Sequence, residues 1–328
     1  MEKRRFYIIA LLIISTITEL SAQWDTQFSQ YWEFKDYYNP SYVGYTDNLL
    51  CNFAYRYNYA ALESSPTQTV ITINSPISLL GYGHGAGIVL STDKIGSLRN
   101  NSINLQYSYR YRFGSSAFNI GMRAGIHDIN FDSNSLELIK DSTNLGKDRI
   151  VVTTTSKKQI FDVGTGISFI NDRFNIGVAI LHINQPEYYV INSADGMSDL
   201  INVNDSTASS IPITFNFLSS YNIKASNSLI VQPMLFGQYN KLESSLNLTI
   251  RVVANDKFSG GVSWITNQGF NLFAGISMKE FDIGYAFSNG QKGTSINNGG
   301  SHEIFFRYDL SKENSMTKYK RHKSIRLL

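Results

Sequence analysis

The stretch from residue 102 to 130 constrains the fold most, because apolar and polar side chains alternate along it. Two runs, 103–111 and 118–126, place an apolar or aromatic residue at every second position, and a short turn separates them. Successive side chains of a strand point to opposite faces, so the stretch predicts a hairpin with one apolar face. The other face is polar and carries Arg110 and Arg123. A soluble sandwich would bury the apolar face in a core, whereas an outer-membrane barrel would turn it to lipid and the polar face to a lumen.

The first 22 residues have the features of a secretory signal peptide. Basic residues at positions 3–5 precede an apolar stretch over 6–14, and Ala22 supplies a small residue before Gln23 at the expected cleavage point. The apolar stretch is too short to span a bilayer as a helix, and the chain after it has no apolar run of about 18 residues. We therefore expect a signal peptide over 1–22 and no transmembrane helix in the mature chain.

Strand-like runs recur along the rest of the chain. About fourteen can be placed, each near the roughly 9–11 residues that a tilted strand needs to cross a bilayer. The runs cover 50–59, 67–74, 85–92, 102–113, 117–127, 160–170, 174–183, 212–221, 229–239, 245–254, 258–265, 270–278, 281–288 and 302–310. They predict an all-β fold, a transmembrane antiparallel up-and-down β-barrel over 49–310. The aromatic and polar stretch 23–48 is expected to be a periplasmic N-terminal segment, and 311–328 a basic periplasmic tail.

The lengths of the connections favour the barrel over the sandwich. Counted from the first strand, the even connections are tight or short, whereas odd ones such as 128–159, 184–211 and 289–301 are long and polar. Outer-membrane barrels have short periplasmic turns and long extracellular loops. Two odd connections, near 241–244 and 266–269, are short and weaken the pattern without reversing it. An even strand number with this parity predicts that both termini lie in the periplasm.

Energetics indicate which face of each strand looks inward. Arginine on the lipid face near the bilayer midplane costs on the order of 2–4 kcal/mol. Arg56, Arg110, Arg123 and Arg251 occupy the polar register of their strands, so we expect them to face the lumen. A closed barrel also leaves no sheet edge unpaired in lipid. The sequence leaves open whether the lumen is empty or plugged, and the long connection after residue 128 could fold inward.

Composition agrees with a membrane barrel. The chain holds 20 Tyr and 20 Phe, and only 17% of its 328 residues are charged, which suits strands with aromatic rings at a membrane interface. Candidates for these interfacial girdles are Tyr57, Tyr59, Tyr109, Tyr111 and Phe281.

Nothing in the sequence predicts catalysis, a cofactor or a metal. The net charge of +3 is too small to indicate a nucleic-acid partner, and the single cysteine, Cys51, allows no disulfide framework. The five histidines show no metal-ligand spacing, and the glycines of 81–87 do not match a dinucleotide fingerprint. No nucleophile-elbow sequence is present, and the acidic and amide residues of 128–159 match no calcium loop. The tail 311–328 is either solvated or docks on an acidic partner or anionic headgroups.

The segment expected in the periplasm carries a resemblance to a known family. Its two blocks are 25–31 and 39–44, followed by Tyr55-Arg56 on the first strand and His302-Glu303 on the last. The residues that match are Gln27, Phe28, Ser29, Gln30, Tyr31, Asn39, Pro40 and Gly44. The chain resembles the PorP/SprF family, outer-membrane components of the type IX secretion system of Bacteroidota.

The resemblance implies a non-enzymatic accessory barrel without cofactors. Such a barrel would work beside the large translocon barrel and dock the periplasmic ring of lipoprotein and ring-forming subunits. It would also dock secreted cargo with a C-terminal sorting domain, such as gliding adhesins. One alternative is an outer-membrane diffusion channel or small-solute transporter, which the polar lumen face favours. A soluble secreted β-sandwich used for adhesion is a third interpretation.

Overall fold

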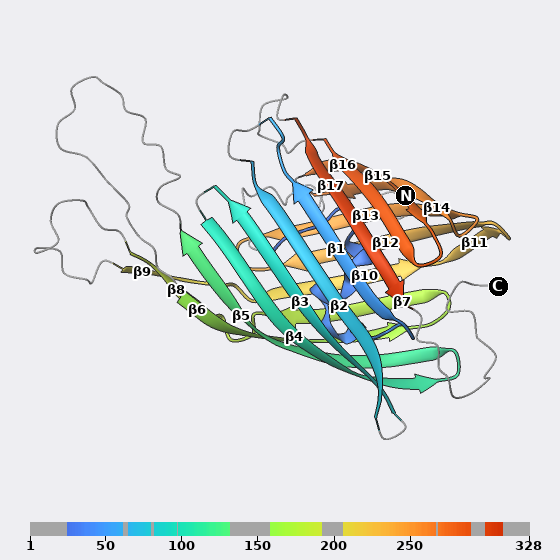
Figure 1. Cartoon of the computed structure of the whole chain (residues 1–328), viewed down its shortest axis with the longest axis horizontal. Helices are drawn as coiled ribbons and strands as arrows, with labels where there is room; N and C mark the ends of the chain where they lie inside the picture. The colour runs from blue at the N-terminus through green and yellow to red at the C-terminus, as the bar shows by residue number, and fades with distance from the viewer. Residues whose placement is uncertain are drawn as a thin grey trace, which may run out of the picture.

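The structure, a computed structural model, describes residues 25–61, 65–79, 82–96, 98–131, 158–191, 206–266, 268–289 and 299–310. Fourteen strands of these residues form one closed antiparallel barrel (Figure 1). They are β1 (Leu49–Tyr57), β2 (Thr67–Leu79), β3 (Tyr82–Ile95), β4 (Leu98–Phe113), β5 (Ser116–Phe131), β6 (Lys158–Ile170), β7 (Phe174–Leu181), β10 (Thr214–Tyr221), β12 (Leu229–Tyr239), β13 (Ser244–Ala254), β14 (Phe258–Ile265), β15 (Gly269–Ser277), β16 (Phe281–Ser288) and β17 (Ser301–Leu310). The predicted fold class is confirmed, and each strand expected from the alternation is present.

Pairing of the first and last strands closes the sheet. β1 pairs with β17 along its whole length, and β10 pairs with both β7 and β12. A short strand, β11 (Ile223–Ser226), follows β10 beside β12, while β8 (Glu187–Ile191) and β9 (Ser206–Ser210) form a separate hairpin after β7. Because one sheet closes on itself, the two-sheet sandwich is wrong for this chain.

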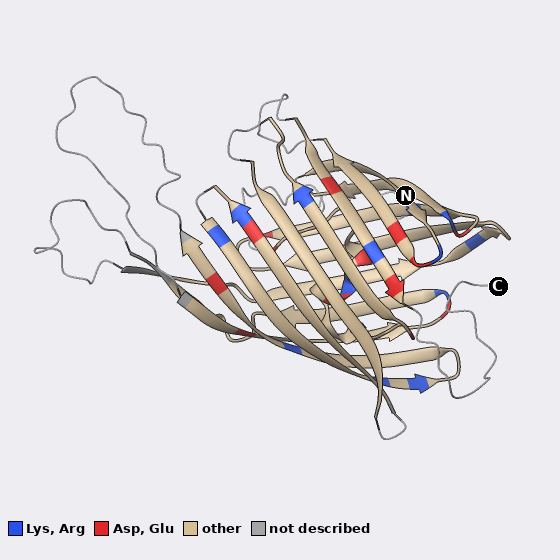
Figure 2. Cartoon of the chain, in the orientation of Figure 1, with Lys and Arg blue, Asp and Glu red and all other residues tan. Residues whose placement is uncertain are grey.

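Burial along the strands is the reverse of that in a soluble protein. On β4 and β5, Leu105 and Met122 are 63% and 61% exposed, whereas Gln106 and Arg110 are only 4% and 7% exposed. The outer face is therefore apolar, and the polar residues point to the interior. Most of the strand length in Figure 2 carries no charge. This is the arrangement that a barrel wall in lipid requires.

Short turns and long connections lie at opposite ends of the barrel. The β4–β5 turn has only Gly114 and Ser115 between its strands, and Gly114 has a φ of +59°, which glycine adopts without strain. At the other end, the connections after β5, β7 and β16 include residues outside the described ranges. The expected signal peptide and basic tail also lie outside the described residues. No helix within the described ranges has the length and apolar character needed to cross a membrane.

The N-terminal segment occupies the barrel interior, and this corrects the expectation of a periplasmic segment over 23–48. Residues 26–44, here called the plug, form the short helices η1 (Tyr31–Glu33), α2 (Lys35–Tyr38) and η2 (Pro40–Tyr42), which lie inside the barrel in Figure 1. All of the plug except Lys35 is buried. The plug starts at the long-connection end of the barrel and leaves at the short-turn end, where the chain enters β1.

Candidate functional site

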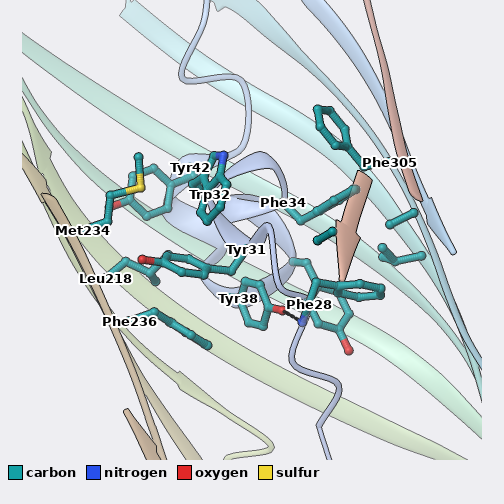
Figure 3. Packing of buried hydrophobic residues seen from close by; sticks show 14 of the residues in the cluster. Phe28, Tyr31, Trp32, Phe34, Tyr38, Tyr42, Leu218, Met234, Phe236 and Phe305 are labelled. Carbon is teal, nitrogen blue, oxygen red and sulfur yellow. Dashed lines mark hydrogen bonds between the residues drawn. The ribbon is translucent and has the colours of Figure 1, made fainter. Parts of the chain in front are cut away.

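The filled lumen is the candidate functional site, and its centre is an aromatic core. Tyr31 stacks on Phe236 of β12 with ring centroids 5.0 Å apart, and Trp32 packs on Phe273 of β15 at 4.7 Å. Tyr38 also contacts Phe236, and its hydroxyl accepts a hydrogen bond from the Phe28 amide at 2.9 Å. Figure 3 shows Tyr31 and Tyr38 of the plug close to Phe236 of the wall. The aromatic rings of 28–38 are thus buried by the wall, which explains a segment rich in rings but without alternation.

A carboxylate of the wall holds the first half of the plug. Glu303 of β17 accepts hydrogen bonds from the backbone amides of Ser29 and Gln30 at 2.6 and 3.0 Å. The guanidinium of Arg56 lies 3.8 Å from the same carboxylate and also donates to the Gln27 carbonyl. Glu303 therefore binds two backbone donors of the plug and one charge of the wall.

A carboxylate of the plug makes the reciprocal contact with the wall. Glu33 pairs with Arg307 of β17 and lies 3.7 Å from Arg251 of β13. Burial by itself raises the pKa of the Glu33 carboxyl, but Arg307 and Arg251 outweigh it, and the net pKa lies below the ordinary value. Glu33 therefore stays ionised and bridges two wall strands.

Next to this pair, Lys35 and Asp36 are enclosed with fewer opposite charges. The Lys35 ammonium lies 5.8 and 5.6 Å from the ring centres of Tyr42 and Tyr45. Burial lowers the pKa of Lys35 to about 8. Asp36 accepts a hydrogen bond from the Asn74 side chain at 2.7 Å, yet burial raises the pKa of its carboxyl. Both groups lose stabilisation by water that their partners only partly replace.

The second half of the plug lies against glycines of the wall strands. Asn39 donates from Nδ2 to the carbonyls of Ile167 and Val178, and its Oδ1 accepts from the amide and hydroxyl of Ser41. A Cβ on Gly121 of β5 would lie 2.4 Å from the Pro40 backbone. The wall glycines thus let the turn after Asn39 approach the strands at backbone distance.

The predicted site residues all lie in or around this interior. Gln27, Phe28, Ser29, Gln30, Tyr31, Asn39, Pro40 and Gly44 are buried plug residues. The four arginines point inward and are spread along the lumen rather than clustered. Their plug partners are the Gln27 carbonyl for Arg56, the Gly44 carbonyl for Arg110, the Tyr37 carbonyl for Arg123 and the Glu33 carboxylate for Arg251.

Several charged residues of the site were not singled out from the sequence, among them Arg307, Asp162 and Glu33. Arg307 and Asp162 lie on inward positions of β17 and β6, and Glu33 lies in a segment without periodicity. For Arg307 and Asp162 the signal is a charge in the inward register of a strand, the same signal that identified Arg56, whereas Glu33 has no such signal. Inward aromatic residues such as Phe236 and Phe273 break the apolar-outward pattern and could have indicated a filled lumen.

Comparison with known proteins adds the following. The sequence model of one family, described as type IX secretion system membrane protein PorP/SprF, matches residues 20–308. No curated protein matches the chain. In fold, the chain is similar to a deletion mutant of the TodX monoaromatic hydrocarbon channel, with a TM-score of 0.50 and 10% identity over 83% of this chain and 93% of that one.

Two further solved barrels are similar to a lesser degree. The Pseudomonas putida toluene transporter TodX has a TM-score of 0.48 and 9% identity, over 89% of this chain and 95% of its own. A Pseudomonas aeruginosa FadL homologue has a TM-score of 0.47 and 10% identity, over 83% and 92%. At such identities the likeness concerns the fold alone.

Proposed function

The chain belongs to the PorP/SprF family of type IX secretion system membrane proteins, and on this premise we propose that it is a non-enzymatic outer-membrane accessory component of that system. In this role it docks secreted cargo with a C-terminal sorting domain, the periplasmic ring, or both, beside the main translocon. Its barrel supplies a fixed position in the membrane, and the connections at its two ends supply contact surfaces.

The filled lumen is the observation that supports docking over conduction. The plug contacts wall strands on opposite sides of the barrel, through Glu303 of β17 at one place and Asn39 against β6 and β7 at another. The void bounded by Tyr31, Trp32 and Met234 is about 10 Å³, about the size that holds one water molecule. A solute would have to displace the plug, together with its aromatic core and ion pairs.

We propose that the short turns face the periplasm and the long connections face outside. Under this orientation Asp25 lies at the outer end, because it contacts His182 just after β7. The described part of the chain would then start near the outer opening rather than in the periplasm. The end of β17 and the tail that follows stay periplasmic, within reach of the ring.

Gene deletion in the native bacterium tests the secretion role. We expect loss of secretion of at least one protein with a C-terminal sorting domain, restored by the wild-type gene. Pull-down of the tagged barrel from detergent extracts should recover that cargo or ring subunits. Unchanged secretion of every such protein, together with no recovered partner, would contradict the proposal.

The alternative of a diffusion channel has a separate test. We expect the purified barrel to give no steady conductance in planar bilayers, whereas a variant lacking residues 26–44 should conduct if it folds. Heat-modifiable migration on gels checks that the variant is a folded barrel. Steady conductance by the wild-type protein would favour the channel.

A further inference from the structure

A buried cluster of ionisable side chains lies at the long-connection end of the lumen, outside the aromatic core of the plug. His127 lies on β5, Asp162 on β6 and His182 directly after β7. All three are at most 5% exposed. Asp25, immediately before the plug, contacts His182. They are distant in sequence and meet because β5, β6 and β7 are neighbours in the barrel.

Each imidazole of the cluster has one nitrogen that faces the Asp162 carboxylate and one that contacts an oxygen of another residue. Asp162 lies between the rings, with Oδ1 2.9 Å from His182 Nδ1 and Oδ2 3.5 Å from His127 Nε2. The ring nitrogens that point away from Asp162 have other partners: His182 Nε2 is 3.1 Å from Asp25 Oδ1, and His127 Nδ1 is 3.2 Å from Asn100 Oδ1. Histidines that bind metals have this arrangement, because an oxygen acceptor on the second nitrogen fixes the tautomer and orients the ring.

The contacts of His127 leave the lone pair of Nε2 directed at Asp162. Asn100 Oδ1 accepts, so the ring proton of neutral His127 sits on Nδ1, and Nε2 turns its lone pair toward the Asp162 carboxylate. Within the described ranges Nε2 has no hydrogen-bond partner, although the side chain is buried. Two buried acceptors that face each other are stabilised by a cation between them.

We propose that His127 Nε2, His182 Nδ1 and the Asp162 carboxylate bind one divalent transition-metal ion of the zinc type. Two imidazoles and one carboxylate are ligands that zinc favours, whereas calcium and magnesium prefer oxygen alone. Asp25 and Asn100 would hold the second ring nitrogen of His182 and of His127, respectively. The ion would tie the start of the plug to three wall strands, below the connections that follow β5 and β7.

Zinc binding requires the three ligand atoms to move closer together by a modest amount. The three ligand atoms lie within 4.8 Å of one another, whereas zinc–nitrogen bonds of about 2.0–2.1 Å place tetrahedral ligands about 3.3 Å apart. Arg123 lies 3.1 Å from Asp162 Oδ2 and competes for this oxygen. Asp162 can keep Arg123 on Oδ2 and offer Oδ1 to the ion. The Asp25 side chain beside His182 is 14% exposed, so solvent reaches this edge of the cluster.

Metal binding to the full-length barrel tests the proposal directly. The protein is purified in detergent without a histidine tag, stripped with a chelator and titrated with zinc chloride. We expect one zinc per chain by elemental analysis after dialysis. Cobalt(II) in place of zinc should give an intense visible absorption band, because a site of low coordination number strengthens these transitions.

Matched histidine variants locate the site. His127→Gln and His182→Gln should weaken zinc binding by at least tenfold, and Asp25→Asn by about tenfold through the orientation of His182. His84→Gln and His302→Gln change half-buried histidines that contact tyrosines on the outer face, and should bind zinc like the wild type. Heat-modifiable gel migration confirms that each variant is folded.

Two results would overturn the metal site. One is a wild-type barrel that retains no zinc and gives no cobalt band, which would leave the cluster as a network of hydrogen bonds and ion pairs. The other is a zinc stoichiometry and affinity that His127→Gln and His182→Gln leave unchanged. If His182→Gln does not fold, the cobalt spectra of the wild type and of His127→Gln decide.

Discussion

At the scale of residues, two buried carboxylates, Glu303 and Glu33, join the plug and the wall. Glu303 of the wall binds plug amides, and Glu33 of the plug binds Arg307 and Arg251 of the wall. A buried charge without a partner is costly, so each half of a pair depends on the other. The plug and the barrel are therefore expected to be stable together and less stable apart.

Replacing Glu303 tests this dependence. Glu303→Gln keeps the size of the side chain but removes the charge that faces Arg56 and two backbone amides. We expect plug docking to weaken by roughly 2–4 kcal/mol. Amide hydrogen exchange of residues 26–44 measures the change. Glu280→Gln, in the turn between β15 and β16, is the control because Glu280 is only half-buried, and equal protection in both variants would contradict the role of Glu303.

Lys35 predicts a pH dependence of plug docking. Its pKa is about 8 in the folded barrel, because of burial, against an ordinary value of 10.5. Between these values the released plug binds more protons than the docked plug, so docking strengthens as pH rises, by up to about 1.4 kcal/mol per pH unit. Below pH 8 both states hold the proton, and the full cost of burying the charge remains.

Hydrogen exchange of the plug, corrected for the intrinsic rate, should show this rise between pH 8 and 9.5. Glu33, Arg251 and Arg307 are the charged groups near Lys35, and none of them is expected to titrate in that range. Lys35→Met should remove the slope. A slope of equal size in Lys35→Met would assign the effect to another group.

At the scale of elements, the plug depends on glycines of the wall strands. β5 and β6 meet the turn after Asn39 through Gly121 and Gly166, where a Cβ would lie 2.4 Å and 2.2 Å from plug atoms. The atoms that Gly121 would meet belong to the backbone of Pro40 and Ser41, which cannot rotate away. The strands themselves pair through backbone groups and do not need these glycines.

Gly121→Ala should therefore displace the plug and leave the barrel intact. Overpacking of this kind costs about 1–3 kcal/mol. We expect faster amide exchange over residues 39–44 and unchanged heat-modifiable migration. Gly237→Ala on β12 is the matched control, because its nearest neighbours would lie 3.8 Å from the new Cβ. Loss of plug protection in both variants would point to a general effect of alanine in the wall.

At the scale of the whole molecule, the two ends of the barrel differ. One end carries short turns such as that at Gly114 and Ser115, and the other carries long connections and the β8–β9 hairpin. The plug also distinguishes the two ends, because its first residue lies at the long-connection end and its last residue at the short-turn end. The orientation in the membrane therefore decides which partner reaches the start of the plug.

Cysteine labelling on intact cells tests the orientation. In a Cys51→Ser background, Glu187→Cys on β8 should react with a membrane-impermeant maleimide. Ser115→Cys in the β4–β5 turn should react only after the outer membrane is permeabilised. Both positions are exposed, so burial does not limit either reaction. The opposite labelling would invert the proposed orientation.

The sequence by itself determined the fourteen strands and the face that each turns inward. Both follow from alternation, which is a local property of a strand and needs no knowledge of its partners. Leu105 outside and Gln106 inside are an example, because the cost of a polar group in lipid fixes the phase. The same inward register predicted Arg56, Arg110 and Arg123 at the lumen.

Only the tertiary structure decided what fills that lumen. Residues 26–44 have no alternation, and their burial depends on the diameter that fourteen strands enclose. The contact of Glu303 with the Ser29 amide joins positions 274 residues apart, and no local pattern encodes such a pairing. His127, Asp162 and His182 likewise lack a metal-binding spacing, because the order of β5, β6 and β7 around the barrel brings them together.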